Sequence, residues 1–394
     1  MAGAPSPEPP ELPPPSPLSD LDLDFILPEI LPKLPPKSYL RFKTVCKSFK
    51  NFISSPEFTR LNHRQFLPSN NRLLNIPATN RTLYTFDLDS LSSAPYATFR
   101  WPKGTVSVLG SCNGLLLISH VHDCVLPLML LNPSTRTYID IRSNTVSRDV
   151  PLPRKGNLGF GFDHSSNDYK IVVVHDIDAT GYRSVTTRFT MVYSVNSKSW
   201  RVVDQTNPSD SMERRYGGVL INNHLLHWMF WSPSKRKRRI GCFDVCSEKW
   251  MDDVLLPDYY YDTNHKNYLL DVGVLDGYLF SSFENKVDSC YDVWVMKKYG
   301  VQKSWMKLLS VDISDYLLLH GGVVPVARRG SSSSQVLLRL RHKDELLWYN
   351  KEDNAINEAD VPCLWDLQPY VCNASLVSLR GAKVFGAMYE PYEL

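Results

Sequence analysis

The chain has 394 residues, of which 43% are hydrophobic and 22% are charged, and its formal net charge is +3. This composition is typical of a globular protein and excludes a largely disordered chain or one that coats nucleic acid. The sequence contains no secretory leader pattern and no apolar run long enough to cross a bilayer, and its eight cysteines lack the spacing of a secreted disulfide framework. We therefore expect an intracellular protein, in the cytoplasm, the nucleus or both, without a membrane partner.

Residues 1–19 form a Pro-rich tract with few apolar side chains. Such a tract cannot offset the entropy lost when a backbone is ordered, so we expect a disordered tail. A polyproline ligand is the functional alternative, and composition alone favours a leader without a binding role.

Residues 20–66 change to a helical pattern. From Phe42 to Ile53 the apolar residues recur at steps of three and four, which predicts one stripe of an α-helix, and Ser38 suits its N-cap. Ahead of it, Phe25 to Leu34 is apolar enough for a second short helix, which Pro28 and Pro32 interrupt. A module of this size cannot close a core alone, so we expect an exposed apolar face that awaits a partner.

From residue 67 to residue 394 the sequence predicts β-strands, because runs of Val, Leu, Tyr and Trp alternate with polar turn clusters. A recurring element consists of two large residues seven positions apart, with a polar turn between them. The pairs are Leu131 and Tyr138, Tyr193 and Trp200, Phe243 and Trp250, and more weakly Tyr349 and Ile356, while Trp294 and Trp305 are separated by a longer turn. The second members lie 62, 50, 55 and 51 residues apart, close to the period of kelch-type blades.

A second hairpin signal precedes each pair, for example Cys112-Asn113-Gly114 and Asp276-Gly277. Two hairpins make one four-stranded blade, so the pattern predicts an all-β propeller of six or seven blades after a small all-α module. We expect Leu376 to Met388 to close the ring against a strand near Leu83 to Leu88, which would remove exposed strand edges. A pair of β-sandwiches is the alternative, but it gives no reason for the repeat.

The segment ILPEILPKLPPKSYLRFKTVCKSFKNFISSPEF resembles the F-box, and the segments GSCNGLLLIS, LNPSTRTY, GFGFDHSSNDYKIVVV and VYSVNSKSWRVV resemble the F-box-associated domain of plant F-box proteins, which is a kelch-like propeller. DVWVMKKYGVQKSWMKLLSV extends the likeness toward the C-terminal part of the chain. The resemblance implies that residues 20–66 dock on a Skp-type adaptor carried by a cullin scaffold, and that residues 67–394 hold a protein substrate.

Two departures from the F-box pattern concern the docking surface. The usual opening Leu-Pro falls on Asp22-Leu23, and Phe49 stands where the family usually has Trp. A shorter or kinked first helix is the expected consequence of the displaced Leu27-Pro28. The resemblance assigns the adaptor contacts, or the packing directly behind them, to Leu27, Pro28, Ile30, Leu31, Leu34, Pro35, Leu40, Val45, Cys46 and Phe49.

The substrate site is the least determined part of the sequence. Tyr259, Tyr260 and Tyr261 lie in a loop between blades, where an exposed aromatic cluster would suit protein recognition. Packing of that loop on its own blade is the competing interpretation. The basic run from Lys235 to Arg239 is either a solvated hairpin loop or a nuclear-import patch.

The sequence offers one candidate metal site and no recognisable catalytic or nucleic-acid motif. His224, His227, Cys242 and Cys246 suggest zinc, but residues three apart on a strand point to opposite faces, so the two histidines cannot converge, whereas the two cysteines share a face. Phosphate-binding, nucleophile-elbow and HExxH motifs are missing, and so are nucleic-acid recognition motifs. We expect no metal, no cofactor and no nucleic-acid partner.

The resemblance to plant F-box proteins implies a non-catalytic subunit that recruits substrates to a Skp-cullin-F-box type ubiquitin ligase. The alternative is a propeller that binds a glycan or small ligand, or catalyses a reaction, with no role in ubiquitination. Neither the protein substrate nor the biological pathway is specified by the sequence.

Overall fold

The computed structural model divides the chain into two compact units, residues 1–65 and residues 66–394, and we describe each by itself. The structure describes residues 28–31, 42, 44–53, 58, 72–75, 82–87, 93–98, 105–121, 128–141, 157–178, 186–206, 210–212, 217–234, 236–261, 267–312, 322–329, 334–340, 346–359, 370–371, 377, 379 and 381–384. The Pro-rich tract at residues 1–19 lies outside these ranges.

In the first unit, helix α3 (Lys47–Ile53) is shorter than the predicted stripe. Residues 44–46 form a turn, and the backbone N–H of Phe49 contacts Cys46 Sγ at 3.5 Å. Phe42 is helical, but the prediction of one continuous helical stripe from Phe42 to Ile53 is wrong at residues 44–46, where Cys46 takes the position of an N-terminal cap for α3. Ile53 and Phe58 are buried and form the interior of the described module, with the rings of Phe52 and Phe58 in edge contact.

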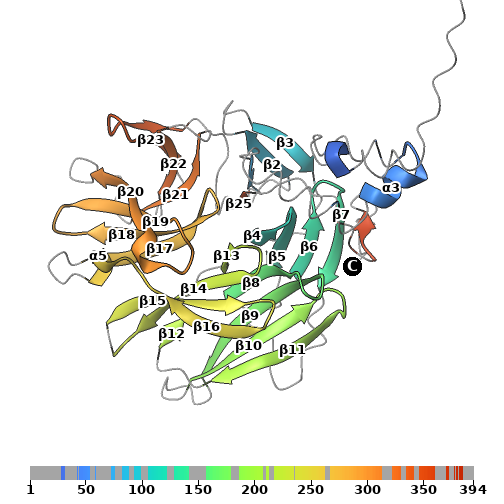
Figure 1. Cartoon of the computed structure of the whole chain (residues 1–394), viewed down its shortest axis with the longest axis horizontal. Coiled ribbons are helices and arrows are strands. Elements are labelled where there is room, and N and C mark those ends of the chain that lie inside the picture. Colours follow the sequence, from blue (N-terminus) through green and yellow to red (C-terminus); the bar gives the residue numbers. More distant parts are fainter. Residues whose placement is uncertain are drawn as a thin grey trace, which may run out of the picture. The chain divides into compact units, whose positions relative to one another are not determined.

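The second unit is an all-β propeller in which five blades are each built from consecutive, antiparallel strands (Figure 1). Blade I contains β4 (Thr105–Cys112), β5 (Leu115–Val121), β6 (Leu128–Asn132) and β7 (Thr137–Ile141). Blade II contains β8 (Asn157–Asp163), β9 (Asp168–Asp178), β10 (Thr186–Ser194) and β11 (Ser199–Thr206). Blade III contains β12 (Ser211–Met212), β13 (Val219–Ile221), β14 (Leu225–Ser232), β15 (Lys237–Asp244) and β16 (Lys249–Val254).

The remaining two blades have the same construction. Blade IV contains β17 (Asn267–Leu275), β18 (Tyr278–Asn285), β19 (Cys290–Met296) and β20 (Trp305–Asp312), with a short 3₁₀ turn η3 (Gln302–Ser304) before its last strand. Blade V contains β21 (Val323–Arg328), β22 (Gln335–Leu340), β23 (Leu346–Asn350) and β24 (Ile356–Glu358). Helix α5 (Asp258–Tyr261) connects blade III to blade IV.

A sixth sheet is made differently, from β1 (Arg72–Asn75), β2 (Thr82–Asp87), β3 (Ser93–Thr98) and the distant β25 (Tyr370–Val371). The prediction of six or seven blades is therefore too high for blades that repeat along the chain, of which the described residues form five. The sequence period does not reveal this difference, because a strand that joins from far along the chain leaves no local repeat.

The predicted closure is also wrong in its partners. Leu73 of β1 pairs with Val371 of β25, whereas β26 (Lys383–Val384), from the segment expected to close the ring, pairs with β7. Asn132 Nδ2 donates to Val377 O at 2.9 Å, and Leu379 is buried in the core of blades I and II. These contacts attach the later segment to blade I instead of to residues 83–88.

The seven-residue pairs are directly opposite one another across the last hairpin of each blade. Tyr193 faces Trp200, and Phe243 faces Trp250. In blades II and III the turn ends in a residue with positive φ, Lys198 at 54° and Glu248 at 55°, and in blade III the carboxylate of Asp244 accepts backbone N–H groups of the turn. An Asx-type acceptor followed by a left-handed residue is a compact way to reverse a strand. The pairing is confirmed except in blade IV, where Met296 takes the place expected of Trp294 opposite Trp305.

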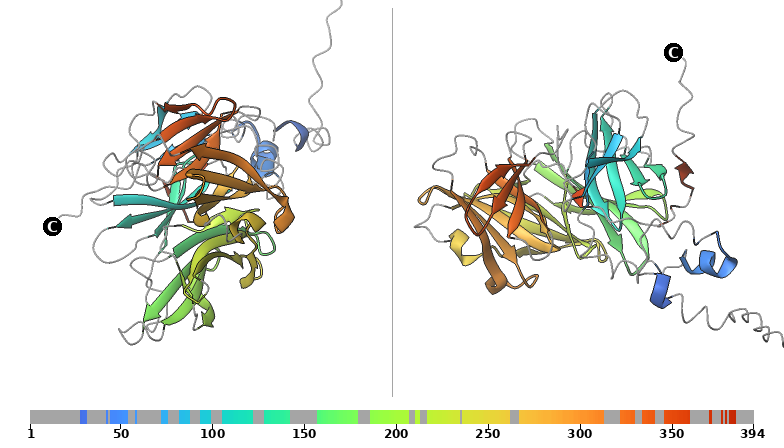
Figure 2. Two further views of the ribbon diagram at one scale, coloured as in Figure 1. Left: turned by 90° about the vertical axis from the view of Figure 1, so that its left-hand side faces the viewer. Right: turned by 90° about the horizontal axis from the view of Figure 1, so that it is seen from above.

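Strands of neighbouring blades lie against one another, β4 on β8, β8 on β14, and β17 on β21. Blades II and III, green and yellow in Figure 1, remain side by side in the two turned views of Figure 2. Side chains alternate across each strand, so a blade can supply apolar residues to the blades on both sides of it. The described core accordingly consists of layers shared by blades I and II, II and III, III and IV, and IV and V. Among the described residues, no helix is long and apolar enough to cross a membrane.

Candidate functional site

The helical module exposes apolar side chains that its own interior does not use. Ile30 is 52% exposed and Val45 is 63% exposed, whereas Leu31 is 2% exposed. Phe49 is half-buried, and its ring stacks on that of Phe42 with the ring centroids 5.7 Å apart. The short module therefore buries part of its apolar set and leaves the rest available to a partner.

The predicted adaptor residues separate into these two groups. Ile30, Val45 and Cys46 are exposed, Pro28 and Phe49 are half-buried, and Leu31 is buried. Leu31 is therefore suited to packing inside the module, behind the surface that would contact the adaptor. Leu27, Leu34, Pro35 and Leu40 lie outside the described residues, and the assignment of all ten to adaptor binding remains a prediction.

The tyrosine cluster follows Asp258 in helix α5, and its first member is part of the fold. The Tyr259 hydroxyl donates to Asp292 Oδ2 at 2.6 Å and accepts from Asn285 Nδ2 at 2.7 Å. Its ring stacks on Trp294 with centroids 5.3 Å apart. Burial, followed by the hydrogen bond and the negative charge of Asp292, raises the pKa of Tyr259. This hydroxyl is protonated and connects α5 to blade IV.

Tyr260 is committed to packing as well. It is 6% exposed, it accepts the backbone N–H of Arg238 at 3.0 Å, and Lys237 Nζ lies 5.6 Å from its ring centroid. The interpretation as a packed loop thus describes Tyr259 and Tyr260, while the side chain of Tyr261 lies outside the described residues. Whether the cluster also contacts a substrate remains a prediction.

The basic run at residues 235–239 is partly used in the fold. Arg236 is exposed, but Arg238 Nη1 donates to Leu269 O at 2.6 Å, and Arg239 Nε donates to Asp210 Oδ2 at 2.6 Å and pairs with Asp253. Lys235 lies outside the described residues. A nuclear-import signal needs extended, accessible basic side chains, so these contacts favour the interpretation as a hairpin loop.

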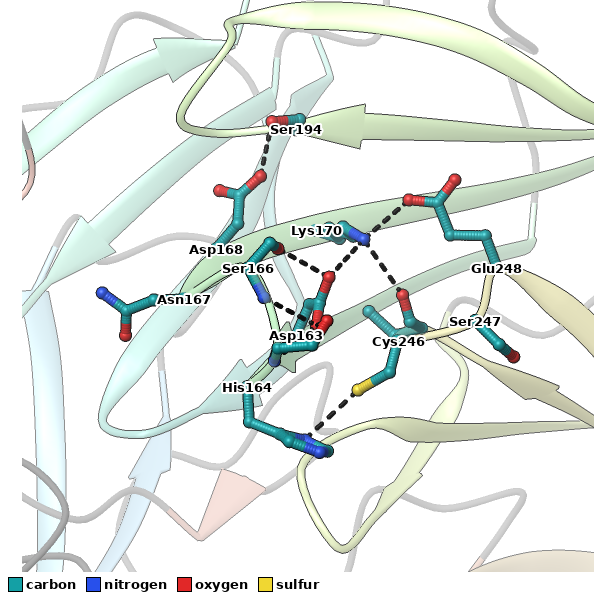
Figure 3. A network of polar contacts seen from close by, with 12 residues as sticks. Asp163, His164, Ser166, Asn167, Asp168, Lys170, Ser194, Cys246, Ser247 and Glu248 are labelled. Atoms are coloured by element: carbon teal, nitrogen blue, oxygen red, sulfur yellow. Dashed lines mark hydrogen bonds and ion pairs between the residues drawn. The ribbon is translucent and has the colours of Figure 1, made fainter.

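A buried ion-pair network joins blades II and III at the ends of their hairpins (Figure 3). Lys170 Nζ lies 2.6 Å from Asp163 Oδ2 in its own blade and 2.7 Å from Glu248 Oε1 in the next blade, and it donates to Val245 O at 3.2 Å. Asp163 also accepts from the backbone N–H and hydroxyl of Ser165. A buried lysine with two carboxylates and a carbonyl has all of its donors satisfied.

The charges of this network determine what it can do chemically. Burial acts against both charged groups, but hydrogen bonds from Lys170 and the turn serines lower the pKa of Asp163 below its usual range. The two carboxylates likewise raise the pKa of Lys170 against the effect of burial. A carboxylate that stays ionised and an ammonium group that stays protonated suit a tie between blades better than general acid-base catalysis.

The four residues considered for zinc separate into two places. His227 is buried between Val219 O and the Tyr299 hydroxyl, which Cys242 also contacts at 3.4 Å. His224 and Cys246 lie instead beside His164, with Cys246 Sγ 3.2 Å from His164 Nδ1 (Figure 3). Cys246 lies in the turn beyond β15, where strand alternation no longer applies, so the expectation that it shares a face with Cys242 is wrong. Among the described residues, no group of three His, Cys, Asp or Glu side chains could hold a metal ion.

Sequence reasoning missed the network around Lys170. Its signal was a lysine within the buried run DYKIVVV, directly after the acidic and serine-rich turn that begins at Asp163. A charged residue in an apolar strand requires a partner, but the sequence does not indicate that Glu248, in another blade, supplies part of it.

The geometry defines a β-propeller protein that also carries a small helical module with exposed apolar residues. Residues 82–378 match the F-box associated beta propeller domain, and residues 18–61 match the F-box domain. Since the first match covers more than half of the chain, the chain belongs to the F-box proteins with an F-box associated β-propeller. The helical module precedes the propeller, and a kelch-type repeat is not among the matched families.

Curated relatives with F-box names align with most of the chain. The chain is 27% identical over 355 residues to F-box protein CPR1 of Arabidopsis thaliana, with 84% of this chain and 82% of that protein covered. It is 28% identical over 389 residues to F-box/kelch-repeat protein At3g23880 of the same plant, with 93% and 94% covered. A chain in the crystal structure of a nidogen/laminin complex aligns over 73% of this chain and 92% of its own length at 10% identity, but its TM-score of 0.40 is too low to support an argument.

Proposed function

We propose that this chain is the substrate-recognition subunit of a Skp-cullin-F-box type ubiquitin ligase. The F-box would bind a Skp-type adaptor and, through it, the cullin scaffold, while the propeller would hold a protein substrate for ubiquitination and degradation. The observation that carries this proposal is the presence of an F-box domain at residues 18–61 and an F-box associated propeller at residues 82–378 in one chain. We place this activity in the cytoplasm or the nucleus.

The exposed apolar residues of the module support adaptor binding. Ile30 and Val45 are large side chains exposed on a unit whose described interior is small. Burial of such side chains against a partner stabilises a complex by about 25 cal/mol per Å² of apolar surface. Since F-box domains bind Skp-type adaptors, we expect such an adaptor to cover these exposed apolar side chains.

The properties of the propeller support a non-catalytic role. The buried charged groups around Lys170 and Arg188 are paired within the fold, as in the contacts of Arg188 with Asp176 and Asp210 at 2.7 and 3.0 Å. Groups held in this way maintain the blades and their loops. The loops are then available to vary with the substrate.

Co-expression with a Skp-type adaptor tests the proposal directly. The full chain and the adaptor are expected to elute together from a size-exclusion column, and a chain that lacks residues 1–65 is expected to elute alone. A full chain that remains separate from adaptors of several plant types would contradict the proposal. Affinity purification from native tissue, with the proteasome inhibited, then identifies the substrate as a protein whose ubiquitination depends on the chain.

A further inference from the structure

The outer edge of blade I is covered by a segment from far along the chain. β26 adds to β7 as a fifth strand and is drawn in red beside it in Figure 1. In the other four sequential blades, the strand order of the described residues ends with the last strand of the blade itself. Blade I therefore differs from them in having its edge closed by a distant segment.

The covering segment has a buried part and an exposed part. Leu379 is 6% exposed and belongs to the core of blades I and II. Gly381, with φ at 74°, then turns the chain onto the edge in a conformation that favours glycine. Lys383 and Val384, which form β26, are both exposed. Leu379 therefore anchors the segment, and β26 lies on the surface.

The exposed part is weakly held. β26 pairs with Thr137 and Tyr138, and among the described residues the pairing on this edge goes no further along β7, which extends to Ile141. Lys383 Nζ lies 2.9 Å from Asp140 Oδ2, but these two side chains are 59% and 40% exposed. An ion pair exposed to this degree contributes little to stability. Local opening of β26 is therefore easy while the anchor stays in the core.

The edge beneath β26 has the features of a site that recognises a strand. A partner strand could pair with all five residues of β7, whereas β26 pairs with two of them. Asp140 supplies a carboxylate, and the centroid of the Tyr138 ring lies 5.8 Å from Lys383 Nζ. Because side chains alternate across a strand, the residue opposite Ile139 would lie on the side of the apolar core. This edge suits a strand with a basic residue opposite Tyr138 and an apolar residue next to it.

We propose that β26 is a displaceable strap, and that the edge of β7 binds an extended, basic segment of the protein substrate in its place. The inference rests on the proposed function in one respect, since the partner is the substrate. The strap is tethered and competes at high effective concentration, so a strand with more pairing residues is needed to displace it. A β26 donated by a second copy of the chain would make the same two pairs and would gain nothing by the exchange.

The experiment uses the full chain and a fluorescent peptide with the central sequence Val-Thr-Val-Lys-Val, whose lysine falls opposite Tyr138 in the antiparallel register. A matched peptide carries glutamate in place of that lysine. We expect the lysine peptide to bind about fivefold more tightly to the Lys383→Glu variant than to the unaltered chain, because Asp140 then repels the strap. Asp140→Lys should reverse the preference and favour the glutamate peptide. Lys249→Glu, at an exposed position on the outer strand of blade III, is expected to bind like the unaltered chain.

Hydrogen exchange locates the bound peptide. The lysine peptide should protect backbone amides of β7 and expose those of β26, and the melting temperature of Lys383→Glu should stay unchanged, which separates release of the strap from unfolding. Absence of binding, equal binding of the two peptides, or protection away from β7 would overturn the proposal. A dimer of Lys383→Glu on size-exclusion chromatography would show instead that a second copy occupies the edge. Adaptor co-elution of the same variants tests the proposed function separately, because β7 is not part of the F-box.

Discussion

The ammonium group of Lys170 lies 2.7 Å from Glu248, so a buried lysine of blade II is neutralised in part by a carboxylate of blade III. Both side chains are largely shielded from water, and Asp163 completes the set from within blade II. The blades are thus joined by charge as well as by apolar packing. Charges buried in this way are costly when one partner is removed.

Lys170→Met is expected to lower the free energy of unfolding by about 3–5 kcal/mol, because Asp163 would remain buried without its counter-ion. Urea unfolding followed by tryptophan fluorescence measures this. Lys249→Met, at an exposed position of β16, serves as the control and is expected to change stability by about 0.5 kcal/mol or less. A loss below about 1 kcal/mol for Lys170→Met would show that the network is not a stabilising tie.

The same network predicts a pH dependence with a defined sign. The pKa of Asp163 is lowered by folding, so its contribution is present above the unfolded-state pKa of about 4 and is lost as the pH falls below it. The pKa of Lys170 is raised by folding, so its contribution is present below about pH 10 and is lost as the pH rises further. The stability difference between the unaltered chain and Lys170→Met should therefore be largest between these limits and shrink at both ends.

His227 predicts a loss of stability in mild acid. Burial lowers its pKa from the ordinary value to about 4, against the effect of the Val219 carbonyl. The unfolded chain therefore binds a proton that the folded chain excludes, and stability should fall by about 1.4 kcal/mol per pH unit between roughly pH 6.5 and pH 4. Unfolding measured at intervals across this range should show a shallower dependence for His227→Gln. His224→Gln is the control, and an equally steep dependence in His227→Gln would contradict the assignment.

The helical module offers a matched pair of substitutions. Val45→Asp places a charge on a side chain that is 63% exposed, and should abolish co-elution with a Skp-type adaptor without unfolding the module. Ile53→Asp places the same charge in the interior, where the side chain is 1% exposed, and should unfold the module. Circular dichroism and size-exclusion chromatography distinguish the two. Undiminished adaptor binding by Val45→Asp would remove this residue from the interface.

The tyrosine cluster requires its structural and binding roles to be separated. Tyr259→Phe is expected to cost about 1–3 kcal/mol, because Asp292 and Asn285 lose a buried partner while the stacked ring remains. Tyr278→Phe, on an exposed ring, is the control. Replacement of Tyr259, Tyr260 and Tyr261 together by Ser would reduce substrate capture through the fold itself, so Tyr261→Ser is the sharper test of substrate contact. Unchanged capture by a folded Tyr261→Ser variant would withdraw this residue from the substrate site.

The sequence by itself determined the local structure, namely the turns, the helical segment and the strands. The seven-residue pairs, such as Phe243 and Trp250, depend on a polar turn and two large flanking residues, all within one hairpin. The helical segment and the change to strands beyond it are likewise expressed in periods of three to four and of two residues. These features predicted a helical module followed by a propeller, because each results from neighbours along the chain.

Contacts between distant segments could not be predicted from the sequence, because no local pattern indicates which strands become neighbours. Three contacts join elements that come together only on folding. They are the pairing of β25 with β1, the pairing of β26 with β7, and the burial of Tyr260 under the β14–β15 hairpin. The same holds for Lys170 and Glu248, whose charges act on one another across a blade boundary. Electrostatic and packing energies depend on separation in space, so the folded arrangement of the blades decided where these groups meet.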